Sequence, residues 1–471
     1  MTARKIVVIG AGMGGLAAAV RLARGGCAVQ VLDARAVAGG LAAGLELEGF
    51  KFDAGPYILL DRPGLEWAFG SLGMELEAQL SLRRIEDVYE ARSGGSAAVH
   101  FFDSLERTVA TLDETWPGSG RRYRRFIEST AAAYRRLEPI QRVSSPGIGH
   151  LLQTGAWRDV PFLLRPLGSV LASARLPPPV LEALAIWTHI AGQNPAHAPS
   201  PLAFVPSLIH GRGAWYPAGG IAAVPRALNA AAVAAGVEFH LGARVRSIRC
   251  EGGRAIGVEA DSGKFFGADA VLANAGGVGT YLELAPSAVP PRARRRLARL
   301  PLQSPGICVY LAVKGKIPPP YLRFHLPGGG ELCRLLIAPS AVAPEEERNG
   351  WWPARLIAPM RHAEAEEGGP EKQREYLQRI LGESWWKEYA PEHRVLAARI
   401  PAEWGSEFHL HRDSMNPVMT ASFMRAGRLA HRSPFARGLY LAGSSTHPGQ
   451  WVSFCAISGI LAAGLALEDL T

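Results

Sequence analysis

The chain has 471 residues, of which 48% are hydrophobic and 20% are charged. That length predicts roughly two or three domains around a large core, and that composition excludes a disordered protein. Five dispersed cysteines without a CxxC pair argue against a disulfide framework and a cysteine zinc site, and we expect no metal. The net charge of +9 leaves nucleic acid, an anionic membrane or an anionic ligand open as partners.

The first residues lead directly into an apolar run at residues 6–9 that is too short for a signal peptide. The longest apolar candidates, 160–176 and 452–467, are interrupted by arginine, proline or polar residues. A membrane-spanning helix needs about 20 consecutive apolar residues, and neither segment approaches that length. We therefore expect a cytoplasmic protein that at most attaches to the cytoplasmic face of a membrane.

The strongest local signal is a glycine-rich turn between a strand and a helix. Residues 6–9 predict a buried parallel strand, residues 10–15 form a GxGxxG pattern, and helical spacing follows. In such a turn Gly10 permits the tight bend, Gly12 admits a pyrophosphate, and Gly15 allows the helix and strand to pack closely. The free N–H groups of the helix then face the phosphates.

A second strand, predicted over residues 29–33, ends in Asp33. A carboxylate at this position accepts the hydroxyls of an adenosine ribose, which favours FAD or NAD over NADP. A GxGxxG pattern alone is weak evidence for a dinucleotide site, because glycine-rich turns that bind no ligand can have the same pattern. The strand, helix and acid in register make a dinucleotide-binding site the favoured interpretation.

The residues after Asp33 favour FAD. Arg35 and the pair Gly39-Gly40 follow closely, and the pair suits a second approach to a diphosphate. Residues 49–56, GFKFDAGP, predict a strand that enters a turn. From this point the sequence resembles FAD-dependent amine oxidase-like flavoproteins, and more narrowly the bacterial phytoene (carotenoid) desaturase family, in which this segment lies close to the flavin.

The resemblance continues along the chain. Residues 213–220 resemble the Trp-Tyr-Pro-x-Gly-Gly turn of the family, 243–248 the strand whose valine pairs with adenine, and 268–275 the strand ending in Asn-Ala. Residues 439–449, LYLAGSSTHPG, closely resemble its last strand and Thr-His-Pro-Gly motif, ahead of a helix at 452–467. The stretches 100–200 and 320–410 match weakly.

The resemblance implies FAD as the cofactor and indicates which residues bind it. The last strand would bring Gly443 near the ribityl chain and pyrophosphate. The N–H groups of Trp451 and Val452 would open the last helix, whose dipole stabilises negative charge at the flavin N1–C2=O edge. The predicted cofactor-binding residues are Gly10, Ala11, Gly12, Gly14, Gly15, Asp33, Ala34, Arg35, Gly39, Gly40, Leu41, Pro56, Tyr57, Val245, Asn274, Gly443, Ser444, Trp451 and Val452.

Two departures from the family pattern concern the site. Leu41 stands where relatives commonly carry Arg or Lys near the phosphates, and Arg35 is the candidate to replace that charge. After Gly449 the chain continues with Gln450 and Trp451, where relatives have small residues and proline. These side chains would reshape the pocket and leave the substrate open.

The predicted fold class is α/β. We expect a Rossmann-like FAD-binding domain of the glutathione-reductase/amine-oxidase type with an interleaved α+β substrate domain. The FAD-binding domain comprises residues 1–95, 215–285 and 435–471, and the substrate-binding domain comprises 96–214 and 286–434. A lid formed by the second domain would exclude water from the flavin.

No NADPH module is expected, because Gly276-Gly277-Val278-Gly279 has the wrong spacing for a second dinucleotide loop. Reduced flavin would pass electrons to oxygen, a quinone or another acceptor, unless the reaction is redox-neutral.

The basic residues cluster in 121–142, with seven arginines, and in 292–299, with five. Both clusters are also typical of solvated helix faces, and no nucleic-acid-binding signature accompanies them, so we expect no nucleic acid partner. The segment 160–179 is apolar, contains arginines and is too short to span a bilayer. It predicts either peripheral membrane attachment or a buried helix of the substrate domain.

The leading functional hypothesis is FAD-dependent desaturation of a long hydrophobic isoprenoid or polyene. Flavin N5 would accept a hydride from an sp3 carbon while the adjacent carbon loses a proton. No base stands out. His189, Tyr216 and His447 are candidates, although His189 is also typical of a core histidine and His447 of a turn residue beside Pro448.

Other activities share this scaffold and stay open. They are a carotenoid ketolase, a cis–trans isomerase, a saturase, or an amine oxidase with Trp215 and Trp451 as its aromatic cage. A flavin-binding subunit without catalytic activity is the alternative from another class.

Overall fold

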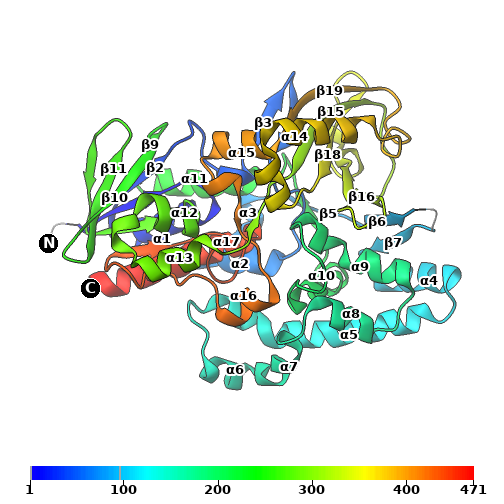
Figure 1. The fold of residues 1–471 in the computed structure, drawn as a ribbon, viewed down its shortest axis with the longest axis horizontal. Coiled ribbons are helices and arrows are strands. Elements are labelled where there is room, and N and C mark those ends of the chain that lie inside the picture. The colour runs from blue at the N-terminus through cyan, green and yellow to red at the C-terminus, as the bar shows by residue number, and fades with distance from the viewer. Residues whose placement is uncertain (1–2, 95–96) are drawn as a thin grey trace.

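The computed structural model describes residues 3–94 and 97–471. One end of the molecule is a five-stranded sheet in which all neighbouring strands run parallel (Figure 1). Its apolar strands are buried on both faces, as parallel sheets require. In spatial order the strands are β21 (Leu439–Leu441), β13 (Ala270–Ala273), β1 (Lys5–Ile9), β2 (Ala28–Asp33) and β9 (Glu238–Leu241). The predicted α/β fold class is confirmed.

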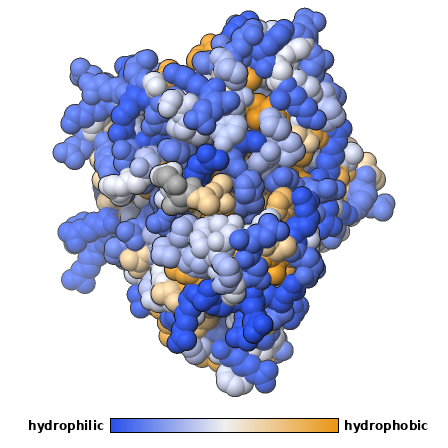
Figure 2. All heavy atoms as spheres, turned by 90° about the vertical axis from the view of Figure 1, so that its right-hand side faces the viewer, coloured by the Kyte–Doolittle hydropathy of each residue, from blue (hydrophilic) through white to orange (hydrophobic). Residues whose placement is uncertain are grey.

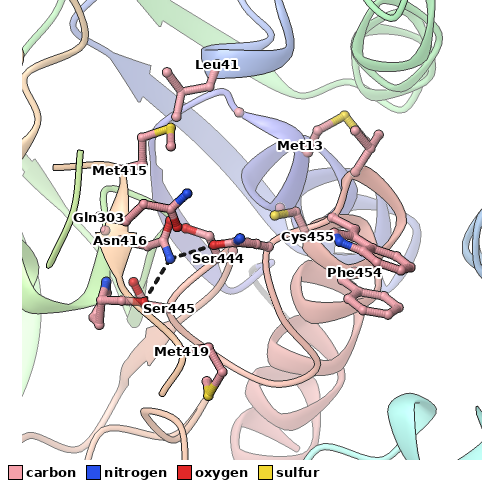
Figure 3. Close-up of a pocket in the computed structure, with 18 of the residues that line it drawn as sticks. Met13, Leu41, Gln303, Met415, Asn416, Met419, Ser444, Ser445, Phe454 and Cys455 are labelled. Atoms are coloured by element: carbon pink, nitrogen blue, oxygen red, sulfur yellow. Dashed lines mark hydrogen bonds between the residues drawn. The ribbon is translucent and has the colours of Figure 1, made fainter. Parts of the chain in front are cut away.

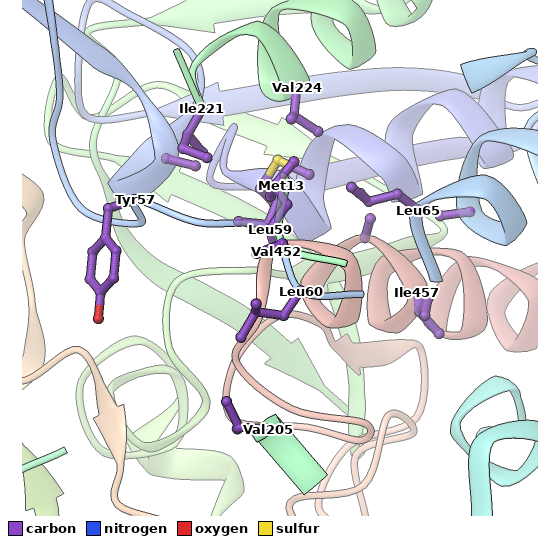
Figure 4. Packing of buried hydrophobic residues seen from close by; sticks show 14 of the residues in the cluster. Met13, Tyr57, Leu59, Leu60, Leu65, Val205, Ile221, Val224, Val452 and Ile457 are labelled. Carbon is purple, nitrogen blue, oxygen red and sulfur yellow. The ribbon is translucent and has the colours of Figure 1, made fainter. Parts of the chain in front are cut away.

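Helices α1 (Met13–Arg24) and α17 (Val452–Leu470) pack against each other beside this sheet. Glycines make the close approach: a Cβ added to Gly459 would lie 2.0 Å from the carbonyl oxygen of Gly14. Figure 4 shows the apolar side chains around this contact, among them Met13 and Ile457. They also meet α11 (Ala223–Ala234) and α2 (Arg62–Ser71), so the contact belongs to the main core.

Helix α17 differs from the sequence-based expectation that no segment approaches a spanning helix. Within its 19 residues, an 18-residue window has a mean hydropathy of 1.5, which is enough by length and composition to cross a membrane. However, 56% of that window is buried inside the protein. The apolar character of α17 is therefore explained by its place in the core.

The second large sheet has seven strands and mixed directions (Figure 1). Only β16 and β6 are parallel neighbours within it, and the other pairs are antiparallel. In order its strands are β19 (His393–Arg399), β15 (Ile307–Lys314), β18 (Trp351–Ala358), β17 (Arg334–Ile337), β16 (Leu322–Leu326), β6 (Asp87–Ser93) and β7 (Val99–Phe102). Its long helix is α14 (His362–Gly382), followed by α15 (Pro401–Phe408).

A lobe of helices lies below this sheet in Figure 1. It consists of α4 (Leu105–Thr115), α5 (Ser119–Leu137), α6 (Ile148–Thr154), α7 (Val160–Leu163), α8 (Leu167–Ser173), α9 (Pro178–Ile190) and α10 (Phe204–Arg212). The face of the molecule in Figure 2 is mostly hydrophilic, with apolar side chains scattered over it, as is usual for a soluble surface.

Short elements join these parts. The antiparallel sheet of β10 (Val245–Glu251), β11 (Arg254–Ala260) and β12 (Phe265–Gly267) adjoins the five-stranded sheet. Three two-stranded pairs are β3 (Gly44–Leu47) with β4 (Phe50–Asp53), β5 (Leu82–Arg84) with β8 (Trp215–Pro217), and β14 (Leu302–Gln303) with β20 (Asn416–Pro417). The remaining helices are α3 (Leu76–Gln79), α12 (Gly277–Gly279), α13 (Pro291–Ala298) and α16 (Ala421–Ala426).

The strand order bears on where one domain ends and the other begins. All five strands of the parallel sheet come from the three stretches expected to bind FAD. Strand β6 lies within the expected stretch 1–95 but pairs with β16 of the other sheet. We therefore keep two interleaved domains as a prediction and place the first boundary before Asp87.

The segment 160–179, expected either on a membrane or in the core, is partly buried and partly exposed. On and after α8, the side chains of Leu167, Val170, Leu171 and Leu176 are buried in the main core. Leu164, by contrast, is exposed. Periodic apolar spacing is the same for a core helix and a surface helix, which is why the sequence left both open.

Candidate active site

A cavity of about 1380 Å³ connects the parallel sheet with the helical lobe. At one end it is lined by the loops that follow β1, β2, β13 and β21, all at the carboxyl edge of the sheet. At the other end it is lined by apolar side chains of the lobe, including Leu137, Leu163 and Phe204. Ligands of open parallel sheets bind at this edge, and the cavity extends that site into apolar surroundings.

Two glycine loops form a cradle at the sheet end. Gly10 turns the chain with φ of +90°, and the N–H of Gly39 donates to the carbonyl oxygen of Ala11 at 2.8 Å. A Cβ added to Gly40 would lie 3.0 Å from the Cα of Gly12. Any side chain at these glycines would fill the space between the loops. The cradle therefore fits a diphosphate held by backbone N–H groups.

The carboxylate of Asp33 ends β2 beside this cradle. It accepts the N–H of Ala11 at 2.6 Å and the N–H of Arg35 at 2.8 Å, so the two loops are tied through it. It also lines the cavity, where a ribose hydroxyl can reach it.

Arg35, the residue expected to supply charge at the phosphates, lines the cavity and is also held by neighbouring side chains. Its guanidinium lies 3.2 Å from the carboxylate of Glu407 and 4.2 Å from the ring centroid of Phe408. It also donates to the carbonyl oxygen of Gly40 at 3.3 Å. Arg35 thus braces the second glycine loop, and Glu407 offsets part of its charge.

Of the predicted cofactor-binding residues, all except Ala11 and Gly15 line the cavity. Ala11 acts through its backbone, as described above. A Cβ on Gly15 would lie 1.9 Å from the carbonyl oxygen of Gly10, so this glycine is needed for packing between helix and strand. The amide of Asn274 lies over the first loop and donates to the carbonyl oxygen of Gly10 at 3.4 Å.

The three candidate bases are placed differently. His189 and Tyr216 are not among the residues that line the cavity. The Nδ1 of His189 accepts the N–H of Cys333 at 3.0 Å, and the hydroxyl of Tyr216 donates to Asp53 Oδ2 at 2.9 Å. Both side chains thus have structural partners.

His447 does line the cavity, and its Nε2 donates to the carbonyl oxygen of Ile140 at 3.0 Å. Burial lowers the pKa of His447 to about 4, so its ring is neutral at pH 7. Its Nε2–H holds the turn against the segment around Ile140, and a pKa of about 4 makes the ring a weak base.

The two tryptophans considered for an amine-binding cage are not together at the cavity. Trp451 lines it and stacks on Phe454, with ring centroids 4.9 Å apart. Trp215 is not part of the lining; its indole N–H donates to the carbonyl oxygen of Arg212 at 2.8 Å, and the guanidinium of Arg62 lies 4.7 Å from its ring. These two residues therefore do not form a cage.

Side-chain amides gather on one wall of the cavity, opposite Phe454 and Cys455 of α17 (Figure 3). Asn416 Nδ2 donates to Gln450 Oε1 at 2.7 Å, and Gln303 comes from the neighbouring strand β14. The unusual Gln450 after Gly449 is thus held by Asn416. The pairing of β14 with β20 places Gln303 beside Asn416. No local sequence motif predicts this pairing.

Among the ionisable lining residues that the sequence interpretation did not name, Asp61 and Arg428 contact α17 or the turn that leads to it. Asp61 caps α2, accepts the hydroxyl of Ser453 at 2.7 Å, and has its pKa raised by burial. Arg428 donates to the carbonyl oxygen of Ser444 at 3.2 Å. An aspartate ahead of a helix is a recognisable cap signal, whereas nothing in the sequence around Arg428 indicates a site.

The parallel sheet, the glycine cradle at its carboxyl edge and the acid at the end of β2 define a dinucleotide-binding oxidoreductase with a large apolar cavity. The match to a family model gives the particular family. The chain belongs to the flavin containing amine oxidoreductases, whose model matches residues 13–467. Its cofactor is FAD, and it is an FAD-dependent oxidoreductase. The family resemblance predicted from the motifs is confirmed.

Characterised relatives match over nearly their whole length. The chain is 29% identical to a zeta-carotene-forming phytoene desaturase of Myxococcus xanthus, over 97% of this chain and 93% of that protein. It is 27% identical to a lycopene-forming phytoene desaturase of Pseudescherichia vulneris, over 99% and 100%. It is also 24% identical to a 4,4'-diapolycopene oxygenase of a Methylomonas species, over 99% of each.

Solved structures share the fold. An oxidoreductase of Methanosarcina mazei superposes with a TM-score of 0.66 at 18% identity, over 97% of this chain and 99% of that one. A putrescine oxidase with three substitutions superposes with a TM-score of 0.67 at 16% identity, over 99% of each chain. At such low identity the likeness concerns architecture and not substrate.

Proposed function

We propose that the chain is an FAD-dependent desaturase that introduces double bonds into a long acyclic isoprenoid polyene. The observation that carries this proposal is the continuity of the cavity. The glycine cradle and the apolar side chains of the helical lobe line one space of about 1380 Å³. Such a space holds a cofactor and an extended hydrocarbon end to end. The full-length relatives named phytoene desaturases support the substrate class.

Bound FAD supplies the acceptor for a hydride from an allylic sp3 carbon of the polyene. The chain contributes orientation and the exclusion of water. The stacked rings of Trp451 and Phe454 present an apolar surface at the start of α17, against which a polyene can lie. The N-terminal dipole of that helix favours negative charge at its end. With its pKa lowered to about 4, His447 is a weak acceptor for the proton that the polyene loses.

The test is anaerobic incubation of the FAD-loaded protein with phytoene in liposomes. We expect the flavin absorbance to bleach and chromatography to show products with added double bonds. The matched variant Gly40→Val, which fills the cradle, should lose both FAD and product. An FAD-loaded protein that leaves phytoene unchanged, or that releases hydrogen peroxide with a primary amine, would contradict the proposal.

Oxygenation is the second candidate function. The relative named 4,4'-diapolycopene oxygenase covers as much of the chain as the desaturases do. Repeating the incubation with an acyclic carotenoid under labelled oxygen separates the two reactions. Incorporation of the label into the product identifies an oxygenase, whereas unlabelled product with added double bonds identifies a desaturase.

We further propose that the protein takes its substrate from a membrane at whose cytoplasmic face it works. The support is an apolar patch on and beside α6 and α7, made of Ile148, Leu152, Trp157 and Leu164, which are 77%, 61%, 52% and 53% exposed. Figure 1 shows α6 and α7 at the lower edge of the helical lobe, and both contact residues 156–159, which join them. Exposed Arg158 and Arg165 alternate with these side chains, which suits anionic headgroups.

The position of the patch links the membrane to the cavity. Leu163 lines the cavity and directly precedes Leu164 of the patch. Residues 143–146 also line the cavity and lead into α6. A polyene that leaves a bilayer at the patch would therefore reach the cavity without crossing water.

Flotation with liposomes containing phosphatidylglycerol tests this attachment. We expect the wild-type protein to float at low salt, and the double variant Leu152→Asp, Trp157→Asp to bind at least about fivefold less because it loses buried apolar area. The control is Val233→Asp on α11, since Val233 is 57% exposed but lies outside the patch. Wild-type protein that stays unbound at low salt would refute the proposal.

A further inference from the structure

The inference concerns Arg428, a cation in the wall of the cavity between α16 and β21. Its Nη1 donates to the carbonyl oxygen of Ser444 at 3.2 Å. A Cβ added to Gly449 would lie 3.0 Å from its Nη2, so the guanidinium packs directly on that residue. Arg428 thus touches both ends of the turn that joins the last strand to α17.

The described part of the chain provides no counter-ion for this charge. Within residues 3–94 and 97–471, no carboxylate forms an ion pair with Arg428. Burial lowers the pKa of Arg428 to about 10, which still leaves the side chain protonated at pH 7. A guanidinium has five N–H donors, and the carbonyl oxygen of Ser444 uses one of them. Arg428 is half-buried, and the described residues give its guanidinium a single hydrogen-bond acceptor, so an anion brought into the cavity would be bound favourably.

The neighbours of Arg428 indicate which part of the cofactor would lie nearest to its charge. They are Ser444, His447, Gly449 and Cys455, all in the closing turn or the first turns of α17. None belongs to the glycine loops after β1 and β2, which form the diphosphate cradle. The same closing turn leads to Trp451 and Val452, the residues expected at the pyrimidine edge of the flavin.

We propose that Arg428 stabilises negative charge on the flavin ring and thereby raises its reduction potential. The inference rests on the proposed function: a hydride would bring two electrons and one proton from the polyene, so a flavin ring that is neutral when oxidised would gain one negative charge. The N-terminus of α17 contributes about half a positive charge near this turn. Arg428 adds a full charge, and charge placed near the ring is how a protein tunes flavin chemistry.

The test compares Arg428→Met, which removes the charge, with Arg428→Lys, which keeps it. The readouts on FAD-loaded protein are the flavin midpoint potential and the dissociation constant of sulfite, whose adduct also leaves negative charge on the ring. For Arg428→Met we expect sulfite to bind at least about tenfold more weakly. A tenfold change in a two-electron equilibrium corresponds to about 30 mV. We therefore expect the midpoint potential of Arg428→Met to fall by at least about 30 mV. Arg428→Lys should lie close to wild type.

The control is Arg425→Met, because Arg425 is exposed on α16 and is not part of the cavity lining. Its potential and sulfite affinity should be unchanged. A wild-type potential in FAD-loaded Arg428→Met would overturn the inference. So would weaker FAD binding with an unchanged potential, which would place the charge at the diphosphate. These readouts need no polyene, so a failure of the proposed desaturation would leave them unaffected.

Discussion

The contact between α17 and the glycine loop predicts that Gly459 controls FAD binding from a distance. In Gly459→Ala, the added Cβ would lie 2.0 Å from the carbonyl oxygen and 2.8 Å from the carbonyl carbon of Gly14. Real Cβ contacts are essentially never under 3.0 Å, so α17 and the loop must separate by about 1 Å. Overpacking of this kind costs about 1–3 kcal/mol, and the displaced backbone belongs to the FAD cradle. We expect the FAD dissociation constant to rise at least about tenfold.

The matched control is Gly464→Ala on the same helix. An added Cβ there meets nothing within 4 Å, and the exchange of glycine for alanine in a helix is worth about 0.8–1 kcal/mol of stability. FAD binding is measured by the quenching of flavin fluorescence, and stability by thermal unfolding of the apoprotein. Gly464→Ala should be as stable as wild type or more stable, with normal FAD affinity. If Gly459→Ala matched Gly464→Ala in both measurements, the steric reasoning would be refuted.

Two further predictions concern the stability of the folded chain. Tyr216→Phe removes the hydroxyl that donates to buried Asp53 and should lower the free energy of unfolding by about 1–3 kcal/mol. The pH profile of FAD-dependent turnover should stay unchanged. A shifted profile would show that Tyr216 takes part in the reaction. Burial lowers the pKa of four histidines to about 4, so the unfolded chain binds more protons between about pH 4 and 6.5. Their stabilisation is complete above about pH 6.5 and is lost as the pH falls, by up to about 1.4 kcal/mol per pH unit for each histidine. Urea unfolding between pH 4 and 7.5 measures this slope, and a variant with His431→Asn should show a smaller one.

The elements that could be predicted from sequence are those whose signal is local. The strand at residues 6–9, its glycine turn and the following helix are one contiguous unit, and Asp33 ends the next strand. The closing motif at 439–449 is likewise continuous with α17. In each case the residues that touch the cofactor cavity are neighbours in sequence, so their spacing carries the structural information.

What the sequence did not show depends on contacts between distant segments. Arg35 was expected to face the phosphates, yet its carboxylate partner Glu407 lies 372 residues further along the chain. Strand β6 joins β16 across more than 200 residues, which places it in the second sheet. Pairings over such separations are set by packing of the whole chain, and no periodic pattern within one segment encodes them.

The positive charge of the chain illustrates the same limit. In the cluster at 121–142, Arg136 pairs with Asp159 at 2.6 Å and Arg142 with Glu138 at 3.1 Å. The cluster at 292–299 lies largely on α13, which Figure 1 places well away from α6 and α7 and hence from the apolar patch. Clustering along the sequence therefore marks mainly solvated or paired helix faces. Arg428 belongs to neither cluster. It lines the cavity, and no carboxylate among the residues that the structure describes pairs with it, so its charge can act on the reaction.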